Sequence, residues 1–97
     1  MPKRVISPNH TLVVYDLVPR RGYLQFDVSA DGPIDVFVTD HEGYSTYRTG
    51  REFKPYAAVR DTVQWTSDVD LPFRGRWYLL LVNRSPQVRS VRYETNP

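Results

Sequence analysis

The sequence predicts an all-β protein, a small antiparallel β-sandwich of jelly-roll-like form with about six to eight short strands. Short segments rich in β-branched and aromatic residues alternate in hydrophobicity with a period of two, and turn residues separate them. No stretch of useful length shows a helical period. A chain of 97 residues has room for one domain, so we expect residues 1–97 to form a single β-sandwich domain with flexible ends at 1–10 and 94–97.

The first half of the chain contains three predicted strands. Residues 11–18 (TLVVYDLV) and 23–29 (YLQFDVS) are two of them, and a turn at 19–22 joins them. The tripeptide Asp31-Gly32-Pro33 is typical of a tight connection, and it leads into the alternating segment 34–39. We therefore expect 23–29 and 34–39 to form a hairpin.

The second half contains a loop and three further strands. Two glycines and a proline interrupt residues 41–56, which predicts a long loop. Residues 57–65 alternate imperfectly, which indicates a bulge or an edge position. Residues 76–82 (RWYLLLV) are apolar on both faces, as a central strand covered on both sides would be, and residues 88–93 form the last predicted strand.

Charge and composition exclude several classes of protein. The absence of cysteine removes disulfides and thiolate metal sites. A net charge of +2 is too small to indicate a polyanionic partner, and aromatic residues do not interleave with the C-terminal arginines, so nucleic acid is not an expected partner. Basic residues nevertheless dominate after Asp70. They predict either solvated strand ends or a surface for an anion or an acidic partner.

The sequence also bears on location. No apolar stretch approaches the ~20 residues that span a bilayer, and the segment MPKRVISPNH lacks the apolar core of a signal peptide. We expect a cytoplasmic protein without a membrane partner.

No catalytic or metal-binding constellation is evident. The two histidines, His10 and His41, have no partner in a recognisable triad, and no serine lies in a nucleophile elbow. Asp68 and Asp70 match no calcium-binding loop, and acidic residues at strand ends are normally solvated. We expect no enzyme activity, no cofactor and no metal.

The predicted loop at 41–56 provides the candidate binding residues. Tyr44, Tyr47, Arg48 and Arg51 combine rings that stack on planar ligands with cations that bind carboxylates or phosphates. Trp65 is a further candidate, and its polar neighbourhood is compatible with either a core or an exposed position. The alternative is that the loop aromatics fold back over the open end of the sandwich. Among the loop aromatics, Tyr44 is expected to be the most exposed because it follows a glycine at a turn. In that alternative, Tyr47, Phe53 and Tyr56 cover the open end of the sandwich. Trp77 is expected in the core.

The order of these segments resembles known families. IDVFVTD, then aromatics and glycines in the pattern GY..Y..G..F, then a long stretch to LP and GRWYLLLVN resemble small β-sandwiches of the GOLD type and bacterial pre-peptidase C-terminal domains. They are also similar to small bacterial β domains found beside TIR-type signalling modules in defence proteins. The resemblance covers residues 22–93. It implies an accessory, recognition or sensing role, and no catalytic residue is carried over.

Two functional hypotheses follow. The first is a non-catalytic protein-interaction or sensor module, part of a larger bacterial signalling or defence assembly. It would use residues 41–56 or an exposed sheet edge to bind a protein partner or a second copy. The alternative is a small-ligand or carbohydrate-binding module, with Tyr44, Tyr47 and Trp65 as a stacking platform.

Overall fold

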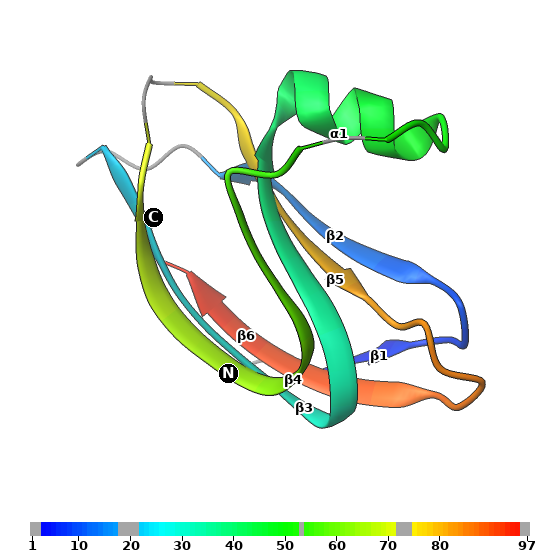
Figure 1. The fold of residues 1–97 in the computed structure, drawn as a ribbon. Coiled ribbons are helices and arrows are strands. Elements are labelled where there is room, and N and C mark those ends of the chain that lie inside the picture. The colour runs from blue at the N-terminus through cyan, green and yellow to red at the C-terminus, as the bar shows by residue number, and fades with distance from the viewer. Residues whose placement is uncertain (1–2, 18–21, 53, 72–74, 96–97) are drawn as a thin grey trace.

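A computed structural model describes residues 3–17, 22–52, 54–71 and 75–95. The elements are β1 (Lys3–Ile6), β2 (Thr11–Leu17), β3 (Tyr23–Asp40), α1 (His41–Arg48), β4 (Ala57–Asp70), β5 (Trp77–Val82) and β6 (Arg89–Thr95) (Figure 1). All strand pairs in this part of the chain are antiparallel. These elements confirm the predicted all-β fold. The one described helix is too short to span a membrane.

Strand β3 organises the sheet. Along one side it pairs with β4 from Tyr23 to Val38. Along the other side it pairs first with β6, over residues 26–30, and then with β5, over residues 35–40. Strand β1 lies outside β6, and β2 lies outside β5. The β3–β4 ribbon curls (Figure 1), so one continuous sheet has a β1–β6 half and a β2–β5 half with the main core between them.

The core follows from the alternation along the strands. Leu24, Phe26 and Val28 face inward from the first part of β3, and Trp77 and Leu79 meet them from β5. Every residue of β5 is buried. This burial confirms that β5 is covered on both faces and that Trp77 belongs to the core. The outer face of β5 belongs to a second apolar cluster, which α1 covers.

Asp31-Gly32-Pro33 does not form the predicted turn, because all three residues lie within β3. The pairing register shifts here, between Ser29 and Ile34, where β3 exchanges β6 for β5 as its neighbour. A proline is tolerated at such a point because its missing N–H interrupts no continuous ladder. The tripeptide therefore bends one long strand and does not end it.

The predicted loop at 41–56 is partly wrong, since α1 occupies His41–Arg48. Asp40 caps this helix by accepting a hydrogen bond of 2.8 Å from the Gly43 N–H. Glu42 in the first turn and Arg48 in the last turn complement the helix dipole. Gly43, which the sequence analysis assigned to a turn, lies in the first turn of this helix.

Three further predictions are corrected at their boundaries. Lys3–Ile6 form β1 although residues 1–10 were expected to be flexible, and β6 extends to Thr95. Strand β4 continues to Asp70, five residues beyond the predicted end, and its register shift confirms the expected bulge. Residues 18–21, Phe53 and residues 72–74 lie outside the described part of the chain, so the predicted turn at 19–22, apart from Gly22, and the prediction for Phe53 fall outside it too.

Candidate functional site

The aromatic residues of α1 attach the helix to the sheet. The Tyr44 ring stacks on Tyr78 of β5, with centroids 4.5 Å apart and an interplanar angle of 17°. The Tyr47 hydroxyl lies 2.6 Å from Thr11 Oγ1 on β2, and His41 Nδ1 lies 2.7 Å from the Tyr78 hydroxyl. Tyr44 and Tyr47 are consequently half-buried, and the expectation that Tyr44 is exposed is not met.

The other predicted site residues lie in different places. The Arg48 guanidinium is 5.7 Å from the centroid of the Tyr44 ring, and Arg51 is exposed beyond the end of α1. Trp65 on β4 meets Phe26 edge to face at 4.8 Å and packs against the main core. The two tyrosines instead contact the second apolar cluster, so the three aromatics of the carbohydrate hypothesis do not share one surface.

We expect Tyr47→Phe to lower the free energy of unfolding by about 1 kcal/mol, because it removes the hydroxyl that contacts Thr11 and keeps the ring. Urea unfolding measures this change. Thr11→Val removes the other hydroxyl, and the double variant should lose little more than either single variant. Additive losses would show that the two hydroxyls do not interact.

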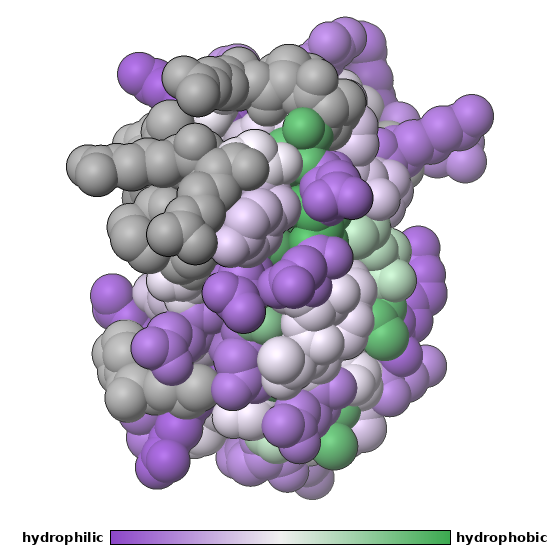
Figure 2. Space-filling model, turned by 90° about the vertical axis from the view of Figure 1, so that its left-hand side faces the viewer, coloured by the Kyte–Doolittle hydropathy of each residue, from purple (hydrophilic) through white to green (hydrophobic). Residues whose placement is uncertain are grey.

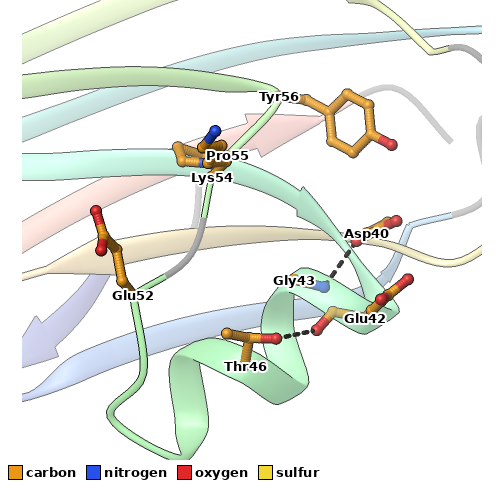
Figure 3. A pocket seen from close by; sticks show the side chains of 8 residues that line it. All are labelled: Asp40, Glu42, Gly43, Thr46, Glu52, Lys54, Pro55 and Tyr56. Atoms are coloured by element: carbon orange, nitrogen blue, oxygen red, sulfur yellow. Dashed lines mark hydrogen bonds between the residues drawn. The ribbon is translucent and has the colours of Figure 1, made fainter.

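A shallow pocket of about 370 Å³ lies between the start of α1 and the chain that leads into β4 (Figure 3). Its lining includes three carboxylates, those of Asp40, Glu42 and Glu52, and one cation, Lys54. The Asp40 carboxylate is already occupied by the Gly43 N–H. Among the described residues, no group of three or more acidic or histidine side chains is arranged to hold a metal.

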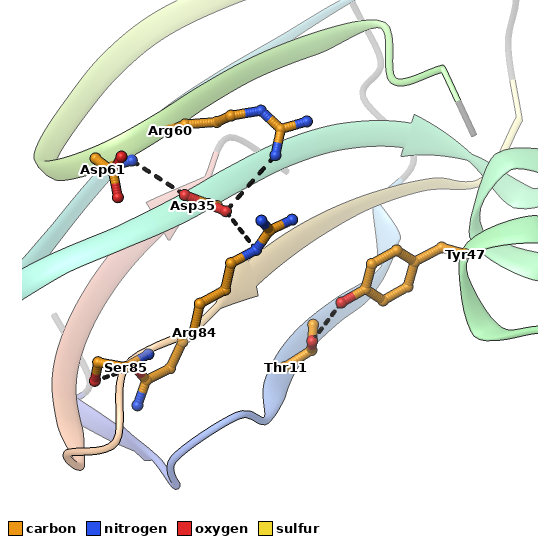
Figure 4. Close-up of polar contacts among 8 residues, drawn as sticks. Thr11, Asp35, Tyr47, Arg60, Asp61, Arg84 and Ser85 are labelled. Carbon is orange, nitrogen blue, oxygen red and sulfur yellow. Dashed lines mark hydrogen bonds and ion pairs between the residues drawn. The ribbon is translucent and has the colours of Figure 1, made fainter. Parts of the chain in front are cut away.

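A second polar cluster surrounds Asp35, which is 4% exposed (Figure 4). Asp35 Oδ1 accepts a hydrogen bond of 3.0 Å from the Asp61 N–H. Oδ2 lies 2.9 Å from Arg84 Nε and 3.8 Å from an Arg60 nitrogen. The Arg84 N–H does not point at that oxygen, so charge alone holds the pair, and both arginines are largely exposed to screening solvent.

The Asp35 cluster has a structural role in the β4 bulge. Ile34 pairs with Thr62 and Val36 pairs with Val59, so two β4 residues lie opposite Asp35. One of them, Asp61, has a left-handed φ of 52°. The Asp35 carboxylate satisfies the N–H that this bulge displaces from the ladder.

One open edge of the sheet lies along β4. Of the described strands, only β3 pairs with β4. Thr62 Oγ1 donates to the Gln64 carbonyl at 2.7 Å and accepts from the Gln64 N–H at 3.2 Å. The Leu71 N–H donates to Gly22 on the β3 side. Because backbone direction alternates along a strand, the backbone groups of Thr66, Asp68 and Asp70 also face away from β3.

We call Thr66, Asp68 and Asp70 the free β4 edge. All three residues are exposed. Figure 2 views the molecule from the side where the yellow-green part of β4 lies in Figure 1, and it shows small separate apolar patches among hydrophilic residues. The sequence predicted a bulge or an edge position for residues 57–65, but the predicted strand ended at residue 65. The alternation of half-buried Ser67 and Val69 with exposed residues was the signal for its continuation.

The comparisons with known proteins add no family. No family model matches the chain, and no curated protein matches it significantly. The function of this molecule must therefore be inferred from its own geometry.

Proposed function

We propose that this domain is a non-catalytic protein-interaction module that binds an extended segment of a partner protein along the free β4 edge. The observation that carries the proposal is the run of outward-facing backbone groups at Thr66, Asp68 and Asp70. Such groups bind an added strand through main-chain hydrogen bonds, and alternate side chains of that strand provide specificity.

The side chains along β4 define the partner. On the inner face, Trp65 and Val69 are only half-buried, although they pack against the main core. Apolar side chains of an added strand would cover the surface of Trp65 and Val69 that is still exposed. On the outer face, Asp68 and Asp70 favour basic residues opposite them. The expected partner segment alternates apolar and basic residues.

The first part of β4 is protected against such pairing. The bulge at Arg60 and Asp61 interrupts the strand, and charged side chains and bulges are common means of blocking an edge. The Thr62 hydroxyl occupies both backbone groups of Gln64. The open stretch is consequently short, which favours reversible binding over aggregation.

Membership in a bacterial signalling or defence assembly, cytoplasmic location and a sensing role are parts of the same proposal. Their support is the sequence resemblance and composition described above. No observation favours the carbohydrate alternative, since Tyr44 and Tyr47 pack on one cluster and Trp65 on another.

The test uses Thr66→Pro, which removes an outward N–H and leaves the β3 ladder intact. Fluorescence anisotropy measures binding of a labelled short peptide that alternates lysine and valine. We expect wild type to bind it and Thr66→Pro to bind at least about tenfold more weakly. Thr66→Val is the matched control, because it also loses the hydroxyl that donates to Asp27 but keeps the N–H.

Peptide chemistry provides a second control. A peptide N-methylated at every residue keeps its charge but has no backbone N–H to donate along either edge, so it should fail to bind wild type. Equal binding of the methylated peptide would show that charge alone attracts it. No binding of the unmethylated peptide at millimolar concentration, or equal binding by Thr66→Pro and Thr66→Val, would refute the proposal.

A further inference from the structure

We propose that the strand added to the free β4 edge is β1 of a second copy, so that copies join head to tail into one continuous sheet. This inference rests on the proposed function and names its partner. It follows from the backbone directions, strand orientations and charges at the two ends of the β1–β6 half of the sheet.

Strand β1 also has an open edge. Of the described strands, only β6 pairs with β1. The Ile6 carbonyl accepts a hydrogen bond of 3.0 Å from Asn83 Nδ2, and the same amide donates to Gln87 at 2.8 Å, just before β6. The backbone of Ile6 therefore faces β6. By alternation Arg4 does too, and Lys3 and Val5 face the open side.

The strand orientations match without any rotation of the second copy. Strand β1 is antiparallel to β6, β6 to β3, and β3 to β4. Strands β1 and β4 therefore run in opposite directions at the two ends of this half of the sheet. A second copy displaced sideways across the sheet brings its β1 beside β4 as an antiparallel neighbour.

The charges of the two edges are complementary. Lys3 on β1 is exposed and basic, and Asp68 and Asp70 on β4 are exposed and acidic. Opposite charges on adjacent strands stabilise a pair, whereas like charges destabilise it. Pairing β4 with β4 of another copy would bring the acidic residues toward one another, so β1 is the better partner.

In a register that satisfies both backbones, Lys3 of the second copy lies opposite Asp68. Its Val5 then lies opposite Thr66, so that residues with outward backbone groups meet each other. On the inner face, Ile6 of the second copy then lies beside Trp65. This register also places the Lys3 ammonium and the Asp68 carboxylate on the same outer face, because Lys3 pairs with Arg92, Arg92 with Ser29, and Asp68 with Gln25 in β3.

Such a contact joins two different surfaces and leaves both terminal edges open. Repeated head-to-tail addition therefore gives assemblies that grow with concentration, whereas a symmetric β4–β4 contact would stop at a dimer. Because β1 has only four residues, we expect weak association that appears at high protein concentration.

The experiment measures the mass of the 97-residue chain by light scattering across a concentration series. We expect the average mass of wild type to rise beyond that of a dimer without a plateau. Lys3→Asp and Asp68→Lys should each weaken association about tenfold or more. An equimolar mixture of these two variants should restore it, because each variant carries edges complementary to those of the other.

Lys54→Asp is the matched control for net charge, since Lys54 is exposed and lies on neither edge. It should associate like wild type, and circular dichroism should show that all variants keep their β structure. A strictly monomeric wild type, or a mixture that does not recover, overturns the inference. A dimer plateau that Thr66→Pro abolishes overturns β1 as the partner but supports strand addition at β4. Association that Thr66→Pro leaves unchanged does not use the β4 edge and overturns this inference, whereas the peptide experiment decides the proposed function.

Discussion

Replacing Asn83 by leucine is expected to lower the free energy of unfolding by about 3–4 kcal/mol, because it removes the polar centre that ties three segments together. Asn83 follows β5 and is fully buried. Its side-chain amide nitrogen, Nδ2, donates to the backbone carbonyls of Ile6, Ser7 and Gln87 at 3.0, 3.3 and 2.8 Å. Its carbonyl oxygen accepts from the Ser85 N–H at 3.0 Å. A leucine side chain would leave these groups without this partner.

Chemical unfolding monitored by tryptophan fluorescence measures the loss. Ser85→Ala is the control, because it removes the hydroxyl at 2.7 Å from Asn83 Oδ1 and keeps the backbone donor. Its cost should be about 1 kcal/mol or less. Hydrogen exchange of the β1 amides should accelerate in Asn83→Leu more than exchange in β5. A variant as stable as wild type would show that Asn83 does not hold β1.

Gly43→Ala is expected to destabilise the protein by about 2 kcal/mol although alanine is the better helix former. A Cβ at this position would lie inside the van der Waals radius of Thr39 Oγ1, which is part of the rigid sheet beneath α1. Thr39 is fully buried, so neither group has room to move. The helix would have to lift from β5, and the contact between Tyr44 and Tyr78 would weaken.

The second variant needed for this test is Thr39→Ala. The Thr39 hydroxyl makes no hydrogen bond with the described residues, so its removal should cost little. In the double variant the space that it vacates accommodates the new methyl group. We therefore expect Gly43→Ala with Thr39→Ala to be more stable than Gly43→Ala alone, as measured by urea unfolding. Additive effects of the two substitutions would disprove steric conflict as the cause.

The hydrophobic pattern within one strand was sufficient to predict which of its residues are buried. The apolar run of β5 predicted burial on both faces and placed Trp77 in the core correctly. Local pattern failed where tertiary packing overrides a turn signal. Asp31-Gly32-Pro33 bends β3 because two different strands pair with it on either side of that point.

The candidate site was harder to predict for a related reason. Tyr44 and Tyr47 have side chains that suit both ligand binding and packing. Only the position of β5 and β2 beneath α1 shows that they pack on the sheet. Which side of β4 lacks a neighbour depends on pairings between residues far apart in the chain. The bulge was visible in the broken alternation of 57–65, but the carboxylate that stabilises it, Asp35, belongs to a different strand.

The position of β6 between β1 and β3 has a consequence for biosynthesis. Strand β6 lies between β1 and β3, so β1, the first of the described strands to be synthesised, has no neighbour until β6, the last of them, has been made. The β3–β4 ribbon can form earlier, since it closes a much shorter loop. A nascent chain that lacks residues 89–95 would present β1 and one side of β3 unpaired. Chaperones that shield exposed strands would therefore act on this domain until translation of β6 is complete.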